Sequence, residues 1–543
     1  MPSTSLSTNA NINALLGTYQ WGTQNGQSAS VSYSFPTSDA IWIAGYTEPA
    51  AGWFELTANQ QISFKNAVSS WAEIANIEFT QVIENKNSVG DIRVTFSNQV
   101  AQENVAGWAY SPVSKLAPQA GDIWLNPEHT DFSPGLRTYF TIIHELGHAL
   151  GLKHPFEEVE GNTTVLTEAE DNSQYTLMSY NEYNGAGFVY QSLGGGQFSV
   201  FPVPPTTPIL YDIAAIQFLY GANMTTRAGN DTYTFSNTQG ELKTIWDAGG
   251  IDTFDLSNQT LAQTINLNAG KFSSLGVKQI SVDGTLNAAT ANIAIAYNVD
   301  IENAIGSSGN DTILGNAINN VLKGGAGNDT INGGLGNDKL LGGTGTDNLN
   351  GNEGNDTYII DSSQDSITEL VNAGIDTVES YVSLILSPNV EKLMLLKGPI
   401  NGTGNDLDNI IFGSSVKNTL NGGLGNDKLI GGAGADVLIG GTGNDLFLFN
   451  NLSAIDTISD FSVKFDTFQL ENAVFTSLTR TGILSAGQFI FGSSAADFND
   501  FLIYNQSNGA LYYDADGNGA IAETQIAKLG INLALTNGDF IVA

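Results

Sequence analysis

Residues 324–350 read GGAGNDTINGGLGNDKLLGGTGTDNLN, which is three successive copies of a nine-residue unit. Six such units follow one another without a gap over residues 306–359, and five more fill residues 404–448. The eighth position of every unit is apolar and the sixth is usually Asp. A Gly/Asn linker would not keep an apolar residue in phase, so the period predicts repeated supersecondary units that stack on one another.

The unit has the pattern GGxGxDxUx, with U apolar, which resembles the calcium-binding nonapeptide repeats of RTX proteins. Its glycines permit tight left-handed turns, and its apolar residue points inward from a short strand. The Asp carboxylate lies on the turn, where hard oxygen ligands suit Ca²⁺. The repeats therefore predict an all-β parallel β-roll that binds several Ca²⁺ ions.

Two units make one coil, so aspartates two units apart should stack on the same edge of the roll. This places Asp311, Asp329 and Asp347 on one edge and Asp338 and Asp356 on the other. The calcium ligands expected in the repeats are Gly309, Asp311, Asp329, Asp338, Asp347, Asp356, Asp427, Asp436 and Asp445. Three units carry Asn320, Asn409 and Asn418 instead, and their turns are expected to bind Ca²⁺ weakly or not at all.

The composition of the whole chain agrees with bound cations. Its 543 residues carry a formal charge of −36 and no cysteine, and the length suggests two to four domains. Such acidity repels nucleic acid backbones and anionic lipid, and the lack of cysteine excludes thiol chemistry. We expect no membrane span and no N-terminal signal peptide, because the chain has no long apolar run and begins with small polar residues.

The first 220 or so residues read as an α+β domain. Strand-like runs occupy residues 30–35 and 77–83. Thr57 and Gln60 form a capping box that opens a helix reaching about Asn76. A second helix is expected from about Pro208 to Tyr220, before Gly221.

Residues 144–154 read HELGHALGLKH and contain three of the four histidines of the chain. On a helix, His144 and His148 share one face and can both reach one Zn²⁺. Gly151 can end the helix in a left-handed turn, which would bring His154 to the metal as third ligand. Glu145 is placed to take a proton from a zinc-bound water. The motif predicts one catalytic zinc ion.

These motifs together resemble the metzincin metalloproteases and, within them, the serralysin family. The resemblance covers nearly the whole chain through the segments GDIWLN (121–126), HELGHALGLKHPFE (144–157), LMSY (177–180), DIAAIQFLYGAN (212–223), WDAGGIDTFD (246–255), IENAIG (301–306) and the repeats. It implies an α+β metzincin catalytic domain followed by the RTX β-roll.

The resemblance also assigns roles in the catalytic domain. It makes Met178 the residue of the Met-turn beneath the zinc and Tyr180 a zinc ligand that swings away to stabilise the oxyanion. Residues 121–126 are expected as the edge strand that pairs with an extended substrate, although an internal strand stays open. His129 is expected to be a solvated loop residue.

The resemblance further implies calcium sites where the two domains join. Their expected ligands are Arg227, Gly229, Asp231, Asp247, Gly249, Gly250, Asp252, Asp300 and Glu302. Asp514, Asp516, Asn518 and Gly519 imitate the start of an EF-hand loop, but Gln525 stands where a bidentate Glu is required. We therefore expect a turn between strands there.

The expected organisation is a candidate pro-segment at residues 1–18, a zinc protease domain at 19–224 and the RTX domain at 225–543, with a secretion signal region at 449–543. Asp539 and the apolar residues after it resemble the C-terminal signal of type I secretion substrates. The expected function is that of a monomeric, secreted zinc endopeptidase acting on proteins or peptides, with type I secretion machinery as a partner. The alternatives are a calcium-dependent adhesin or surface-layer protein with an inactive protease domain, and a metzincin that cleaves some other amide or ester.

Overall fold

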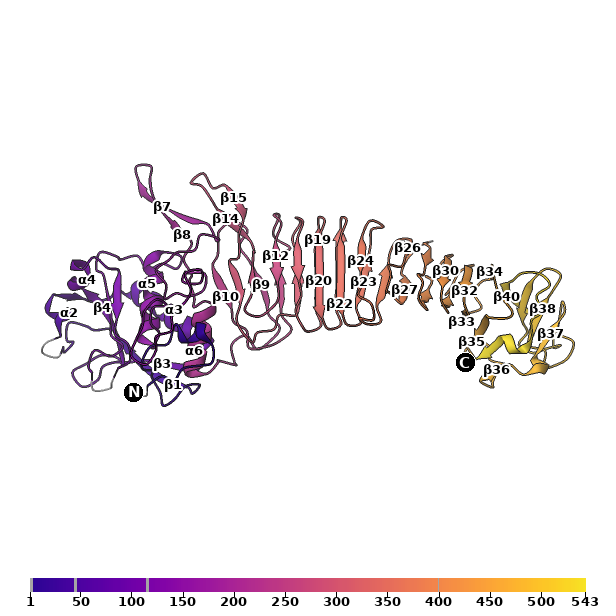
Figure 1. Cartoon of the computed structure of the whole chain (residues 1–543), viewed down its shortest axis with the longest axis horizontal. Coiled ribbons are helices and arrows are strands. Elements are labelled where there is room, and N and C mark those ends of the chain that lie inside the picture. Colours follow the sequence, from indigo (N-terminus) through magenta and orange to yellow (C-terminus); the bar gives the residue numbers. More distant parts are fainter. Residues whose placement is uncertain (1–2, 43–45, 114–116, 399) are drawn as a thin grey trace. The chain divides into compact units, whose positions relative to one another are not determined.

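The computed structural model describes residues 3–42, 46–113, 117–398 and 400–543. It divides into two compact units, Met1–Asn303 and Ala304–Ala543. Figure 1 shows helices gathered in the first unit and successive strands throughout the second. The expected fold class, an α+β catalytic domain and then an all-β region of parallel strands, is confirmed.

The first unit is built around a twisted sheet with the strand order β3-β1-β4-β6-β5. The strands are β1 (Ala29–Ser34), β2 (Trp53–Phe54), β3 (Ile77–Gln81), β4 (Ile92–Ser97), β5 (Gly107–Ala109) and β6 (Ile123–Leu125). The pairs β1/β3, β1/β4 and β4/β6 are parallel, whereas β5 runs antiparallel to β6 and β2 runs antiparallel to β4.

The expectation that residues 121–126 form the edge strand is wrong. β6 lies between β4 and β5, and both of its edges are therefore paired. The edge strand is β5, the last in the strand order. The chain forms β5 first and then places β6 between β4 and β5, so β5 becomes the outermost strand of the sheet.

Two long helices of the first unit agree with the sequence patterns. The helices are α1 (Ala10–Asn13), α2 (Thr47–Ala50), α3 (Ala58–Ile74), α4 (Asn98–Gln102), α5 (Arg137–Ala149) and α6 (Leu210–Tyr220). Gln60 accepts a hydrogen bond from the Thr57 amide at 2.9 Å, so the predicted capping box is confirmed. α6 ends before Gly221, whose φ is +78°.

Residues 225–303 belong to the first unit together with the α+β part, although their composition resembles that of the repeats. The compact division thus falls at 303/304, whereas composition alone suggests a change at 224/225. Gln174 and Tyr183 explain this difference, because they donate side-chain hydrogen bonds to the carbonyls of Ala291 (2.8 Å) and Thr290 (2.7 Å). The strands of this part and the preceding hairpin are β7 (Phe188–Gly194), β8 (Gln197–Pro202), β9 (Thr232–Thr234), β10 (Lys243–Ile245), β11 (Thr253–Asp255), β12 (Thr264–Asn266), β13 (Phe272–Ser273), β14 (Val277–Gln279), β15 (Leu286–Ala288) and β16 (Ile293–Ile295), and β17 (Asn303–Ile305) spans the division.

The second unit is a roll of parallel strands in which units alternate between two sheets. Leu322 of β19 pairs with Leu340 of β21, and Ile331 of β20 pairs with Leu349 of β22, so each coil contains two nonapeptides. The apolar eighth residues of the eleven units are buried throughout both arrays, which confirms the inward phase. Gly334 and Gly336 adopt φ values of +110° and +100°, the left-handed turn that the pattern predicts.

The strands of the repeat arrays are β18 (Thr312–Leu314), β19 (Val321–Ala326), β20 (Thr330–Leu335), β21 (Lys339–Thr344), β22 (Asn348–Glu353), β23 (Thr357–Ile360), β29 (Ile410–Phe412), β30 (Thr419–Leu424), β31 (Lys428–Ile430), β32 (Val437–Thr442) and β33 (Leu446–Phe449). Between the arrays lie β24 (Ser366–Thr368), β25 (Thr377–Ser380), β26 (Leu384–Ile385), β27 (Lys392–Leu395) and β28 (Gly402–Thr403). After them come β34 (Asp456–Ile458), β35 (Thr467–Leu470), β36 (Gly482–Ile483), β37 (Phe489–Phe491), β38 (Leu502–Asn505), β39 (Ala510–Tyr513), β40 (Thr524–Lys528) and β41 (Phe540–Val542), with short 3₁₀ turns at Ala486–Gln488 and Asn537–Asp539.

The EF-hand-like stretch at residues 514–519 joins two antiparallel strands, β39 and β40. The expectation of a turn between strands is therefore confirmed.

Candidate active site and metal sites

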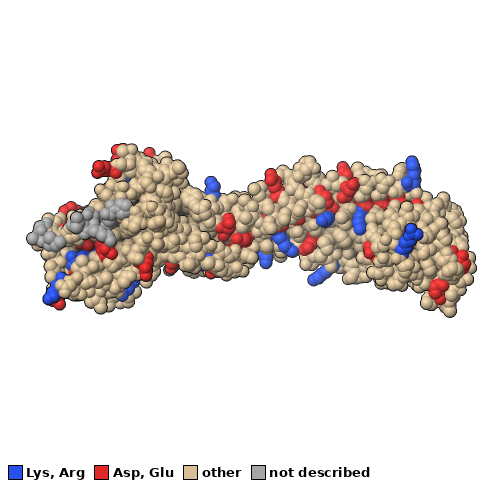
Figure 2. All heavy atoms as spheres, turned by 90° about the horizontal axis from the view of Figure 1, so that it is seen from below, with Lys and Arg blue, Asp and Glu red and all other residues tan. Residues whose placement is uncertain are grey.

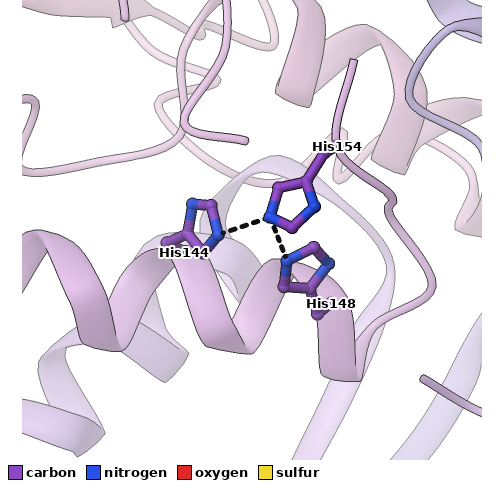
Figure 3. A group of neighbouring side chains, drawn as sticks. All are labelled: His144, His148 and His154. Atoms are coloured by element: carbon purple, nitrogen blue, oxygen red, sulfur yellow. Dashed lines mark hydrogen bonds between the residues drawn. The ribbon is translucent and has the colours of Figure 1, made fainter. Parts of the chain in front are cut away.

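Three imidazoles converge at the end of α5. His144 and His148 project from one face of the helix, and His154 reaches them from the loop that follows (Figure 3). The Nε2 atom of His154 lies 3.0 Å from Nε2 of His148 and 3.3 Å from Nε2 of His144. Gly151, with φ at +105°, allows the chain to reverse between the helix and His154.

The other ring nitrogen of each histidine faces an acceptor. Nδ1 of His144 lies 2.7 Å from the Leu177 carbonyl oxygen, and Nδ1 of His148 lies 2.9 Å from that of Leu152. A carboxylate oxygen of Glu157 lies 2.7 Å from Nδ1 of His154. A proton on each Nδ1 leaves the Nε2 lone pairs free to bind a metal.

Burial keeps the imidazoles of His144 and His148 neutral, as metal ligands must be. Burial and the neighbouring His148 hold the pKa of His144 well below its ordinary value. Burial, together with His154, lowers the pKa of His148 to about 4. Tetrahedral Zn²⁺ with Zn–N distances of about 2.0–2.1 Å needs nitrogens about 3.3–3.4 Å apart. The His144–His154 separation of 3.3 Å matches this spacing, and the His148–His154 separation of 3.0 Å is slightly shorter.

Glu145 lies next to His144 on α5 and lines a cavity there. It is only 5 % exposed, and its Oε2 has no hydrogen-bond partner among the described residues. Burial raises its pKa to about 8, as befits a carboxylate whose charge is stabilised only when a cation or substrate stands near it. A group in this position can accept and return a proton.

Tyr180 stands over the histidines. Its ring centre lies 4.6 Å from that of His154 and 5.9 Å from that of His144, and its side chain is 67 % exposed. Burial of part of the ring raises the pKa of its hydroxyl to about 12, so the group is a proton donor at neutral pH. The Phe156 ring packs against His154, and the two ring centres lie 5.1 Å apart.

The Met178 turn lies beneath the helix. Met178 is fully buried, and its sulfur packs so closely under Gly147 that a Cβ there would stand 2.7 Å from it. Asp212 of α6 holds this turn by accepting hydrogen bonds from the Leu177 amide (2.8 Å) and the Thr176 hydroxyl (2.7 Å). Asp212 lies in the first turn of α6, and no sequence pattern predicted its contact with the Met178 turn.

A cavity of about 550 Å³ opens beside Glu145 and Tyr180. The edge strand β5 contributes Gly107 to its wall, and most of its lining surface is apolar. His129 lines this cavity and is exposed, whereas it was expected only as a solvated loop residue. The ion pair of Arg137 and Glu182 also lies on the wall, and neither residue stood out in the sequence.

Acidic side chains also gather near residue 250 within the first unit. Carboxylate oxygens of Asp231, Asp247 and Asp252 lie within 4.8 Å of one another. Asp252 accepts a hydrogen bond from the Asp231 amide at 2.7 Å, and Oδ2 of Asp252 has no partner among the described residues. Burial and the neighbouring carboxylates raise the pKa of Asp252 to about 6. A cation such as Ca²⁺ would relieve this repulsion.

The other residues expected at that site differ in how they are placed relative to the three aspartates. Glu302 joins the cluster, since it accepts a hydrogen bond from the Asp252 amide at 2.6 Å. The carbonyl oxygen of Gly229 approaches Gly250 so closely that a Cβ there would stand 2.0 Å from it. Gly249 donates its amide to Asp247 at 2.8 Å. Arg227 adopts a φ of +49° and its guanidinium contacts the Trp246 carbonyl, while Asp300 is exposed and is not among the clustered carboxylates.

The repeat aspartates form two ladders along the roll. The amide of Asp311 donates to Oδ1 of Asp329 at 2.7 Å, and the amide of Asp329 donates to Oδ1 of Asp347 at 2.8 Å. The amide of Asp338 bonds in the same way to Asp356 at 2.7 Å. The predicted stacking of aspartates two units apart is therefore present on both edges.

The second carboxylate oxygen of most repeat aspartates accepts no hydrogen bond from the described residues. Oδ2 lacks a hydrogen-bond partner among the described residues at Asp329, Asp338, Asp347, Asp356, Asp427, Asp436 and Asp445. Each of these residues is at most 2 % exposed. Buried carboxylate oxygens without a donor are suited to bind a cation, and oxygen ligands on a tight turn suit Ca²⁺. Figure 2 shows acidic side chains in several separate patches on this face of the molecule.

Asp356 has neighbours that the nine-residue period does not predict. Carboxylate oxygens of Asp356, Glu369 and Asp376 lie within 4.8 Å of one another, and all three residues are buried. Glu369 also accepts a hydrogen bond from the Tyr358 hydroxyl. Glu369 and Asp376 lie outside the arrays, so the repeat pattern could not reveal them. Gly309, by contrast, belongs to the first turn and donates its amide to Ser307 at 2.9 Å.

Family models match along much of the chain. Residues 55–177 match the matrixin family, residues 211–394 match the serralysin C-terminal family, and residues 402–427 and 412–447 match the RTX calcium-binding nonapeptide repeat. These matches confirm the resemblance that the motifs suggested.

Individual relatives agree with the family models. The chain is 35 % identical over 320 residues to Serralysin B of Dickeya chrysanthemi, covering 54 % of this chain and 60 % of that protein. It is 37 % identical over 314 residues to Metalloprotease AprA of Pseudomonas entomophila, with 54 % and 60 % covered. Serralysin of Proteus mirabilis is 34 % identical over 331 residues, with 55 % and 61 % covered. The chain thus spans about three fifths of the length of the curated relatives that it matches.

Proposed function

Because its catalytic and repeat regions both match the serralysin-type metzincins, we propose that this chain is a secreted, calcium-stabilised zinc endopeptidase. The observation that carries the proposal is the convergence of three Nε2 atoms beside the buried, unpartnered oxygen of Glu145. Three nitrogen ligands leave a coordination position for water and substrate. One zinc ion per chain is expected, held by His144, His148 and His154, with Tyr180 as an additional ligand in the resting enzyme.

Each residue then has one chemical task. Zinc at this site would supply a Lewis acid and a water of lowered pKa. Glu145 accepts the proton of the attacking water and later delivers it to the departing amine. The Tyr180 hydroxyl donates toward the oxygen that becomes negatively charged. No acyl-enzyme forms, since no side chain attacks the carbonyl.

Substrate binding is assigned to the edge strand β5 and the cavity beside it. The outer edge of Gly107–Ala109 has no strand against it among the described residues. An extended polypeptide can therefore add to the sheet through main-chain hydrogen bonds. The apolar cavity would then receive one of its side chains. Proteins or peptides are accordingly the proposed substrates.

The proposed functional segments are a protease segment at residues 19–224 and an RTX segment at 225–543, whose turns hold several Ca²⁺ ions, although the compact units divide at 303/304. The C-terminal residues 539–543 are proposed as a signal for type I secretion machinery. Phe540 and Val542 are buried in β41, so this signal would be readable only before the chain folds. No helix in the described ranges has the length and apolarity that crossing a membrane requires.

The test is digestion of casein with millimolar Ca²⁺ held constant and zinc removed by a zinc-selective chelator. We expect proteolysis to stop on zinc removal and to return when zinc is added back. The variant Glu145→Gln should keep about one zinc per chain and lose about 10²–10⁴-fold in kcat/KM, the usual range for general acid–base catalysis. Full proteolysis without zinc, or a Glu145→Gln variant within a few fold of wild type, would refute the mechanism.

Tyr180→Phe separates the roles of the tyrosine. It should lose less activity than Glu145→Gln and keep its zinc, because three imidazoles suffice to hold the ion. A zinc-loaded wild-type chain without any proteolysis would instead favour the alternative, a calcium-dependent adhesin or surface-layer protein. The complete set of His144, Glu145, His148, His154 and Tyr180 supports the enzyme.

A further inference from the structure

The segment just after the N-terminus is buried against the zinc-binding loop. Ala14, Leu15 and Leu16 are fully buried, directly after α1. Sequence alone suggested residues 1–18 as a candidate pro-segment, for which such burial is unexpected. We call residues 13–17 the strap.

The strap pairs with the chain between the second and third histidines. The Gly17 amide donates to the Gly151 carbonyl at 2.8 Å, and the Lys153 amide donates to the Leu15 carbonyl at 2.9 Å. Leu16 and Leu152 face each other in an antiparallel bridge. The strap therefore fixes Leu152, whose carbonyl oxygen orients the His148 ring at 2.9 Å.

Lys153 ties the strap to the loop that carries His154. Its side chain is 3 % exposed, and its ammonium donates to the carbonyl oxygens of Ala14 (2.7 Å), Glu157 (2.6 Å) and Thr164 (2.9 Å). The His154 carbonyl oxygen lies 3.4 Å from the same ammonium, so its three donors are shared among four carbonyl oxygens. Lys153 thus holds the main chain of Glu157, whose carboxylate lies 2.7 Å from Nδ1 of His154.

Asn162 makes a second connection. Its side-chain amide donates to the carbonyls of Asn13 at 2.7 Å and Leu16 at 2.8 Å, and it too is buried. The strap is thus joined to the zinc loop by main-chain bonds, by a lysine and by an asparagine.

We infer that Lys153 and the strap are positioning elements for the zinc ligands His148 and His154, and that residues 13–17 belong to the folded catalytic domain rather than to a removable segment. The inference rests on the proposed function only in treating these histidines as zinc ligands. Outer partners of metal ligands typically change metal affinity 10–100-fold when they are lost, because they orient the ligand and tune its basicity.

The experiment measures zinc release from the full-length holoprotein in millimolar Ca²⁺, with a chromogenic zinc chelator and no peptide substrate. Lys153→Met keeps the length of the side chain and removes the donors, and we expect zinc release to become about 10–100-fold faster. Lys86→Met is the matched control, since Lys86 is exposed, and its release rate should match that of wild type. Unchanged release from a folded Lys153→Met protein would overturn the inference.

A second variant covers the case in which Lys153→Met does not fold. Asn162→Ala removes two hydrogen bonds to the strap and should also speed zinc release, by a smaller factor than Lys153→Met. Unchanged release from Asn162→Ala would then overturn the inference.

Two deletions test the strap itself. Removal of residues 1–8 leaves the strap and should leave zinc release unchanged, whereas removal of residues 1–17 should speed release at least as much as Lys153→Met. Equal zinc release from both deletions would show that the strap is dispensable. Because zinc release is read without substrate, a failure of the proposed protease activity would leave these outcomes unaffected.

Discussion

Turns with Asp and turns with Asn at the sixth position stack on one another in the second array, and they satisfy this buried side chain in different ways. Asp436 accepts the Asn418 amide on Oδ1 at 2.7 Å and leaves Oδ2 without a donor among the described residues. In the neighbouring turn, Asn418 accepts the Ser414 amide at 2.6 Å and donates its own side-chain amide to the Ile400 carbonyl at 2.6 Å.

Asn409 and Asp427 repeat this contrast on the other edge. Asn409 donates to the Val390 carbonyl at 3.0 Å, whereas Oδ2 of Asp427 has no donor in the described part of the chain. The NH₂ group of each asparagine supplies positive hydrogens where a cation would otherwise be needed. An Asp turn therefore needs a cation to satisfy its second carboxylate oxygen. In an Asn turn, the side-chain NH₂ group takes the place of that cation.

The largest expected effect is that of calcium removal on the Asp turns. Each site contributes about 1.4 kcal/mol when Ca²⁺ is tenfold above a dissociation constant of ~10⁻⁴ M, so the seven buried, donor-free carboxylates together contribute about 10 kcal/mol. We expect residues 321–350 and 422–448 to lose hydrogen-exchange protection in chelator, while α3 keeps it. Full protection of both arrays in chelator would contradict the need for an ion.

Alanine substitution of two stacked residues should separate the two kinds of turn. Asp436→Ala removes the acceptor of a buried amide and one calcium site, which should cost about 1–3 kcal/mol in chelator and about 1.4 kcal/mol more in Ca²⁺. Asn418→Ala removes a donor and an acceptor that need no ion, so its cost of about 1–3 kcal/mol should be the same in both buffers. Urea unfolding of the full chain, followed by far-UV circular dichroism, measures both. Equal calcium dependence of the two variants would remove the distinction.

Conversion of one turn into the other is the next test. Asn418→Asp places a carboxylate oxygen against the Ile400 carbonyl, so the variant should be about 1–3 kcal/mol less stable in chelator. In saturating Ca²⁺ it should recover about 1.4 kcal/mol and bind one more ion per chain. Equilibrium dialysis with radioactive calcium counts the ions, and wild type is the reference. An unchanged ion count would show that the backbone of this turn excludes Ca²⁺ whatever the side chain.

The smallest expected effect is that of pH on the calcium-free roll. Burial, followed by the charge of Asp445, raises the pKa of Asp427 to about 7, and burial likewise raises that of Asp329 to about 7. A raised native pKa means that protons bind the folded state more tightly, so this stabilisation is complete below about pH 4 and is lost as pH rises through 7. In chelator the melting temperature of the roll should therefore fall between pH 5.5 and pH 8. In millimolar Ca²⁺ it should rise instead, since protons then compete with the ion.

Patterns with a fixed spacing could be interpreted well from sequence. The nine-residue period identified the inward residues and both ladders of aspartates, because every coil repeats the same geometry. The spacing of His144, His148 and His154 similarly required no knowledge of distant residues. Their convergence follows from one helix and one turn.

Features that depend on distant partners were missed or misjudged. Residues 121–126 have the alternation of any strand, and only the later return of β5 decides which strand is outermost. Lys153 looks like a surface lysine until the Ala14 carbonyl of the strap and the Glu157 and Thr164 carbonyls of the loop after His154 come together around it. Glu369 and Asp376 join Asp356 from outside the period. Composition changes near residue 225, yet the contacts that define the compact units run on to residue 303.

The ladder of aspartates also restricts how such a chain can change its length. Each rung of the ladder is a hydrogen bond from one aspartate amide to Oδ1 of the next aspartate on the same edge, and within the arrays it joins residues 18 apart, which is one full coil. The rungs Asp356–Asp376 and Asp445–Asp466 span 20 and 21 residues instead. Loops can thus grow by two or three residues without loss of a rung. Insertion or loss of a single nonapeptide, however, would move every later aspartate to the opposite edge and place it against the wrong neighbour. Insertion of 18 residues would instead add one whole coil and leave every later aspartate on its original edge.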